Sequence, residues 1–157
     1  MTRVNCRIMV VEADIEGQSS RIINVHAPHS GHKKEELISF WSCLRKVVAE
    51  CGRFFLVVGG DFNAQIKQQS CSAGIGPYVV GAKTNDAGNE LCRFAEDFEL
   101  TAPATWCSPA RATWFHPANC EVSYTLDYIL VSKAKNIQAA AQAEDLKGID
   151  SGSAGLD

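Results

Sequence analysis

The stretch VVGGDFNA, residues 57–64, places an acid and an amide, Asp61 and Asn63, two positions apart at the end of a hydrophobic run. In open α/β sheets reactive side chains gather at the carboxyl ends of strands, because the loops leave the scaffold there. Gly59 and Gly60 let the backbone turn sharply and leave room for a substrate to approach it. Asp and Asn also form ordinary turns by bonding their own backbone, so this pair alone does not define a site.

A second acid, Asp127, stands among hydrophobic residues in SYTLDYILVS, residues 123–132. Alternation along a strand divides this segment between two faces, with Thr125, Asp127, Ile129 and Val131 on one and Leu126, Tyr128 and Leu130 on the other. A carboxylate in such surroundings needs a partner or a function. Asp127 is therefore the third candidate for chemistry.

Three histidines, His26, His29 and His32, recur at every third residue in HAPHSGH. This spacing could suggest a metal site. Pro28 and Gly31 prevent a helix there, so the three side chains share no helical face. We expect loop histidines rather than a metal centre.

The first half of the chain predicts a hairpin, a helix and a buried strand. Residues 8–11 and 21–25 are short β-branched runs separated by the turn-forming EGQSS. A helix is expected over residues 33–51, closed by Gly52 as a C′ glycine. The apolar side chains of its stripe are Leu37, Phe40, Trp41, Leu44, Val47 and Val48. The run 54–58 is apolar throughout and stops at Gly59-Gly60, which predicts a strand buried on both faces.

The second half predicts another helix and further strands. The helix begins near Asn85-Asp86, whose side chains can cap it, and turns Leu91, Phe94, Ala95 and Phe98 inward. A long polar loop, residues 65–83, precedes it, and TAPATW, ARATWFHP and SYTLDYILVS all resemble strands. The order of strands, helix, strand, helix and strands indicates an α/β fold with a mixed sheet.

Composition sets the class of protein. The 157 residues, 46% apolar and 21% charged, suit one compact domain spanning 1–157, and no run approaches the length of a membrane span. No secretory signal is recognisable, and seven cysteines without a CxxC pair predict free thiols in a reducing compartment, so an intracellular protein, cytoplasmic or nuclear, is expected. The net charge of −3 excludes the overall basic footprint of a passive nucleic-acid binder.

The motifs INVHAPH, GGDFNA, ATW and LDYILVS follow one another in this order. Together they resemble the endonuclease/exonuclease/phosphatase superfamily, the fold of deoxyribonuclease I and of the apurinic/apyrimidinic endonucleases. Residues 74–106, with GIGPYVVGAKTNDAGNELCRF and LTAPATW, look most like the endonuclease domain of non-LTR retrotransposons. The resemblance implies a four-layered α/β sandwich, here partial, with mixed sheets flanked by helices. It also implies DNA phosphodiester hydrolysis with Mg²⁺ or Mn²⁺, in a polyprotein that carries a reverse transcriptase.

The resemblance assigns roles to individual residues. Asp61 would orient and deprotonate the attacking water, and Asn63 would donate to a phosphate oxygen, with both near the metal ion as ligands. Asp127 would pair with a histidine of a final SDH motif. His26 stands where the family has a phosphate-contacting tyrosine, and Trp114 matches a position near the DNA-facing surface that could equally be core.

Two elements of the family pattern are missing from this sequence. The principal metal-ligand glutamate would precede Met1, since Glu12 and Glu16 flank what resembles a later hairpin. At the other end DSGSAGLD puts Ala154 and Gly155 where SDH has its acid and histidine. Loss of one transition-state stabiliser costs about 10²–10³ in rate, so impaired catalysis is expected, along with apolar edges exposed by the missing strands. The alternatives are a noncatalytic remnant that keeps a binding surface, and a phosphodiesterase acting on RNA or on lipid or inositol phosphates.

Overall fold

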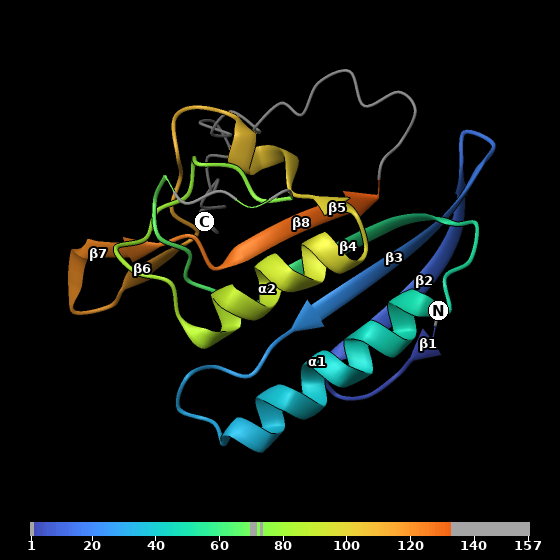
Figure 1. Ribbon diagram of the computed structural model, residues 1–157, viewed down its shortest axis with the longest axis horizontal. Coiled ribbons are helices and arrows are strands. Elements are labelled where there is room, and N and C mark those ends of the chain that lie inside the picture. Colours follow the sequence, from blue (N-terminus) through green and yellow to red (C-terminus); the bar gives the residue numbers. More distant parts are fainter. Residues whose placement is uncertain (1, 70–71, 73, 133–157) are drawn as a thin grey trace, which may run out of the picture.

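The computed structural model describes residues 2–69, 72 and 74–132. Its main feature is a six-stranded sheet in the order β1 (Thr2–Arg3), β2 (Ile8–Ile15), β3 (Gln18–His26), β4 (Phe55–Asp61), β8 (Asp127–Ser132) and β5 (Leu100–Thr101) (Figure 1). The β3–β4 pair is parallel and the neighbouring pairs in this sheet are antiparallel. The other elements are α1 (Lys34–Ala49), α2 (Asp86–Asp97), the 3₁₀ helix η1 (Pro103–Trp106), β6 (Trp114–His116) and β7 (Asn119–Tyr124). The predicted mixed α/β sheet is confirmed.

The predicted hairpin is formed by β2 and β3, which are longer than the β-branched runs that indicated them. Ile8 pairs with Val25 and Ile15 with Gln18, so the turn is confined to Glu16 and Gly17. Both turn residues have positive φ, and the Asp14 carboxylate accepts the Gly17 N–H. The polar residues after Gly17 belong to the strand, with Gln18 and Ser19 exposed and Ser20 buried.

Both helices lie on the same face of the sheet and supply the core on that side (Figure 1). The buried stripe of α1 contains Phe40, Trp41, Leu44 and Val48, and that of α2 contains Leu91, Phe94 and Ala95. Asn85 caps α2 as predicted, since its side chain accepts the Gly88 N–H. The helix α1 ends at Ala49, two residues earlier than expected, and Gly52 adopts its left-handed φ of 58° after the cap.

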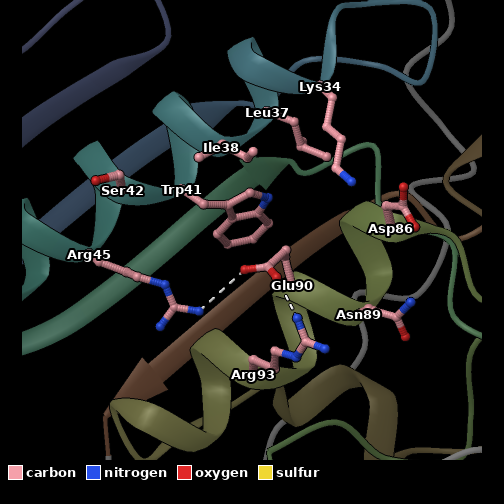
Figure 2. A pocket seen from close by; sticks show the side chains of 10 residues that line it. All are labelled: Lys34, Leu37, Ile38, Trp41, Ser42, Arg45, Asp86, Asn89, Glu90 and Arg93. Carbon is pink, nitrogen blue, oxygen red and sulfur yellow. Dashed lines mark hydrogen bonds and ion pairs between the residues drawn. The ribbon is translucent and has the colours of Figure 1, made fainter.

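A groove of about 470 Å³ separates the outer surfaces of α1 and α2. Figure 2 shows Glu90 of α2 paired with Arg45 of α1 and with Arg93 of its own helix. Arg45 also pairs with Asp97. The arginines of this groove are therefore neutralised by acids of the same surface.

The strand β4 corrects two predictions. It is buried on one face only, through Leu56 and Val58, while Val57 on the other face stays half-exposed. It also runs through Gly59 and Gly60 to Asp61 instead of stopping at the glycines. Gly60 has φ +136°, and a Cβ there would lie 2.0 Å from the carbonyl oxygen of Val25. The glycine is thus needed for the close approach of β3 and β4, not for a turn.

The strand predicted for the segment TAPATW is wrong as well. Leu100 and Thr101 form the short edge strand β5, and the chain then turns into η1. Pro103 lies at the start of that helix, where its fixed φ is favourable and its missing N–H costs nothing. The other two predicted strand regions are confirmed as β6 and β8, although SYTLDYILVS is divided between β7 and β8.

The cysteines whose side chains the structure describes form no disulfide bonds. Cys6, Cys43, Cys51, Cys92 and Cys107 are free thiols, while the side chains of Cys71 and Cys120 lie outside the described set. Among the described residues, neither α1 nor α2 is long and apolar enough to cross a membrane.

Replacement of Gly60 tests the close approach of β3 and β4. Gly60→Ala is expected to lower the free energy of unfolding by more than about 2 kcal/mol, because it adds a clash to a strained backbone. The matched control is Gly59→Ala, whose Cβ would meet its nearest atom at 3.5 Å and which should change stability by less than about 1 kcal/mol. Urea denaturation of both variants measures the difference. Equal stability of the two variants would show that the approach is not tight.

Candidate active site

Three polar residues stand side by side across the central strands. His26 at the end of β3 is the register partner of Asp61 at the end of β4, and Asp61 is the partner of Asp127 at the start of β8. Register partners on neighbouring strands present their side chains on the same face of a sheet. The three side chains therefore lie in one row on the face away from the helices, with His26 and Asp127 exposed and Asp61 half-exposed.

The Asp61 carboxylate is oriented by the residues that follow it. Its Oδ1 accepts the backbone N–H of Asn63 at 2.7 Å, which closes an Asx turn. Asn63 has a left-handed φ of 49°, a conformation that asparagine tolerates better than most residues. Its side-chain Nδ2 donates to the carbonyl oxygen of Ala27 at 2.9 Å. Oδ2 of Asp61 and Oδ1 of Asn63 accept no hydrogen bond from the described residues.

Phe62 anchors this turn to the core through its buried side chain. Its side chain is fully buried between Asp61 and Asn63, and its ring stacks on Trp41 with centroids 6.0 Å apart. Its backbone N–H donates to the carbonyl of Leu126, which joins the turn to the start of β8. With every second residue buried, Asp61 and Asn63 are forced toward solvent.

Asp127 is held by two residues that the sequence patterns did not single out. Thr113 Oγ1 accepts the backbone N–H groups of Leu126 and Asp127, at 3.0 and 3.1 Å. The buried hydroxyl of Tyr128 bonds to the carbonyl oxygens of Ala64 and Thr125, at 3.0 and 3.1 Å. Tyr128 thus joins the Asp61 turn to the approach of β8, and burial raises the pKa of its hydroxyl well above its usual value.

The histidine of the row lies close to the acid. His26 Nε2 is 4.0 Å from Asp61 Oδ2, which is too long for a direct hydrogen bond. Arg7 donates to the carbonyl oxygen of His26 and so supports the end of β3. Arg7 was not predicted as a site residue, since it lies on no motif and reaches His26 only through the β2–β3 pairing.

Trp114 lies on the β6–β7 ribbon, which projects from the end of the sheet where β8 begins (Figure 1). Its ring stacks on Tyr124 with centroids 5.7 Å apart and it is 36% exposed, so it is a surface residue and not part of the core. Phe115 beside it is 57% exposed. The ribbon therefore presents aromatic surface next to Thr113 and Asp127.

An apolar groove of about 720 Å³ begins at Asp127. One side is formed by Ile129 and Val131 of β8, and the other includes Pro103 and Ala104 of η1. Ile129 is 61% exposed. A substrate held at the row of polar residues would meet this apolar surface beside it.

The donor set of the row consists of hard oxygen atoms, namely the carboxylates of Asp61 and Asp127 and the amide oxygen of Asn63. Mg²⁺ prefers such oxygens and is commonly held by one or two carboxylates together with water and substrate phosphate. Across residues 2–132 as described, no three His, Cys, Asp or Glu side chains are grouped to hold a metal ion by themselves. The residues present fit a loosely held Mg²⁺ and not a closed protein cage. Ala154 and Gly155, at the expected SDH position, lie outside the described residues.

No model of a known protein family and no curated protein matches this sequence. Several solved structures are similar to it. The endonuclease domain of TRAS1, a telomere-specific non-LTR retrotransposon, is 15% identical with a TM-score of 0.57, over 81% of this chain and 51% of that one. The 3′ phosphatase NExo from Neisseria, bound to a product DNA hairpin, is 22% identical with a TM-score of 0.55, over 78% and 51%. An endonuclease/exonuclease/phosphatase family protein from Bacteroides thetaiotaomicron is 19% identical with a TM-score of 0.48, over 74% and 36%.

These similarities show the fold. The chain spans about half the length of the first two structures. Its architecture is a partial α/β sandwich of the deoxyribonuclease I type, a scaffold shared by nucleases and phosphatases. The fold predicted from the motifs is confirmed.

Removal of the Tyr128 hydroxyl tests the link between the Asp61 turn and the segment that leads into β8. Tyr128→Phe is expected to cost about 1–2 kcal/mol of unfolding free energy, because two carbonyls lose their partner. Since the pKa of Tyr128 is raised on folding, this contribution is complete below the unfolded value of about 10 and is lost as pH rises beyond it. Urea denaturation at about pH 8 and about pH 11 measures the change.

Tyr124→Phe on the ribbon is the control for this prediction and should alter stability by less than about 0.5 kcal/mol at either pH. A Tyr128→Phe protein as stable as the wild type at pH 8 would contradict the proposed link.

Proposed function

We propose that this chain carries the hydrolytic site of a metal-dependent DNA endonuclease of the retrotransposon type. The observation that supports it most directly is the row formed by His26, Asp61 and Asp127, together with the Asn63 turn. Acid, amide and imidazole groups converge there on one exposed face. They suit a phosphodiester, which is negatively charged and gains further charge as water attacks.

Each side chain has a role in this proposal. Asp61 accepts the proton of the attacking water through Oδ2, while the N–H of Asn63 holds Oδ1 and fixes the carboxylate plane. The exposed His26 donates from Nε2 to a phosphate oxygen that approaches the row from solvent. The second amide hydrogen of Asn63 is free to donate to the phosphate, since Nδ2 gives one hydrogen to Ala27.

Asp61, Asn63 and Asp127 would hold Mg²⁺ or Mn²⁺ through their oxygen atoms. The ion, when bound, supplies charge neutralisation at the phosphate and acidifies water. Asp127 also lines the apolar groove, so the groove adjoins the phosphate position. The chain's own residues thus place the phosphate and leave the groove to the sugar and base.

DNA is the proposed substrate and partner. Exposed Trp114 and Phe115 offer faces on which bases can stack, and the apolar groove beside Asp127 suits a nucleoside. Two structures of similar fold also carry DNA-directed names, one an endonuclease domain and one bound to a DNA hairpin. In the retrotransposon type the same polyprotein would supply a reverse transcriptase.

A second candidate is a DNA-binding module without hydrolysis. It is favoured by the small number of ligands in the row, since the described residues contain no group of three that could hold a metal ion. The two candidates differ in one property, the dependence of strand cleavage on Asp61.

Nicking of supercoiled plasmid tests the proposal. The wild type is expected to nick with Mg²⁺ or Mn²⁺ and to stop when EDTA is added, and Asp61→Asn or Asp127→Asn should reduce the rate by about 10²–10³. The control is Asp14→Asn at the β2–β3 turn, where the asparagine oxygen can still accept the Gly17 N–H and nicking should be unchanged. Equal nicking by wild type and Asp61→Asn would refute the proposal. DNA binding without any nicking would favour the second candidate.

A further inference from the structure

A further cavity, of about 410 Å³, is lined in part by Asn85, whose Nδ2 donates to the carbonyl oxygen of Asn63 in the candidate site. The loop after β3 forms one wall, beginning at Pro28, two residues past His26. The segment that leads into α2 forms the other. Four basic side chains line the cavity, His29, His32, Lys34 and Lys83, against a single acid, Asp86.

The two lysines of this cavity, Lys34 and Lys83, have no ion-pair partner in the part of the chain that the structure describes. In Figure 2, Lys34 extends from α1 toward Asp86 of α2 without an ion pair, whereas Arg45 and Arg93 of the adjoining groove are both joined to Glu90. The positive charge of the cavity is therefore available to an outside anion, and that of the groove is not.

The histidines add hydrogen-bond donors to this charge. His29 Nδ1 accepts the N–H of Gly31 at 3.0 Å, so the proton of its neutral ring lies on Nε2. Arg7 Nη2 lies 3.1 Å from His32 Nε2 and can only donate, so the proton of His32 lies on Nδ1. His32 Nδ1 is buried and has no hydrogen-bond partner among the described residues. Glu36, 4.0 Å from His32 Nε2, is the acid nearest this pair.

The first turn of α2 is not the source of the site. The Asn85 side chain already accepts the N–H of Gly88 and that of Gln65. The two lysine ammonium groups and the Nε2–H of His29 are the groups left for a ligand. Their chemistry matches a phosphate, which takes up several donors and more than one positive charge.

We infer that this cavity, the His29–Lys83 pocket, binds a backbone phosphate of the DNA strand that crosses the row of His26, Asp61 and Asp127. The inference rests on the proposed substrate, not on hydrolysis. Three Cα-to-Cα steps lead from His26 to His29 and span at most about 11 Å. A duplex advances about 3.4 Å along its axis per nucleotide, so the pocket can reach a phosphate within about three nucleotides of the one over Asp61. Such a contact fixes the position of the strand and carries no sequence preference.

Binding of a short fluorescein-labelled DNA duplex, followed by anisotropy across a series of NaCl concentrations, tests the inference. The double variant Lys34→Ala/Lys83→Ala should bind more weakly, with the slope of log Kd against log salt reduced by about 0.9, the value for one lost phosphate contact. Lys34→Arg/Lys83→Arg should restore both affinity and slope. Lys46→Ala is the matched control, since Lys46 is an exposed lysine in the last turn of the same helix and should leave the slope unchanged.

Duplexes with one neutral methylphosphonate at successive positions locate the contact. Wild-type affinity should fall at one position that no longer matters in the Lys34→Ala/Lys83→Ala protein. Equal slopes in wild type and double variant, an equal loss in Lys46→Ala, or a wild type that binds no DNA would each overturn the inference. Binding through Lys34 and Lys83 by a protein that nicks nothing would uphold the pocket and refute only the hydrolytic proposal.

Discussion

The close parallel approach of β3 and β4 is the constraint on which the rest of the site depends. Gly60 allows it, because any Cβ at that position would collide with the carbonyl oxygen of Val25. The approach sets His26 opposite Asp61, and the antiparallel pairing of β4 with β8 sets Asp127 on the other side. Buried Phe62 and Tyr128 then hold the two loops so that the polar side chains of the row reach solvent. A single glycine, Gly60, thus allows residues from three distant parts of the chain to lie side by side.

The sequence predicts the parts of this structure that are decided locally. The apolar stripes of both helices, the Asn85 cap and the β2–β3 hairpin follow from spacing and turn chemistry, and the motifs indicate the fold. The contribution of Gly60 was misjudged, because a glycine before an acid looks like a turn until the neighbouring strand is known. The strand predicted for TAPATW was wrong, because β5 is an edge strand of only two residues and Pro103 favours the start of a helix. Thr113 and Arg7 act through side-chain hydrogen bonds to backbone groups far away in the sequence, which no local pattern predicts.

The charges of the molecule are divided in a way that its net value of −3 conceals. Acids gather at the row, where a divalent cation would offset them, and lysines gather in the His29–Lys83 pocket a few residues away. A polyanion that lies along the end of β3 can therefore contact both a cation held at the row and the lysines of the His29–Lys83 pocket. The opposite face of the sheet is filled by the helices. The row face keeps Val57 half-exposed and Ile129 exposed, in a chain that spans about half the length of the structures it resembles.

The central claim is that the ends of β3 and β4 and the start of β8 form one site for a divalent cation and a phosphate. Paramagnetic broadening of the amide signals of the isotope-labelled full chain by substoichiometric Mn²⁺ measures this without reference to catalysis. The account predicts that the signals of Ala27, Asn63 and Asp127 broaden first and together, that excess Mg²⁺ restores them, and that Gly17 at the far end of the hairpin is unaffected. Broadening confined to another surface, or of Asn63 without Asp127, would contradict it.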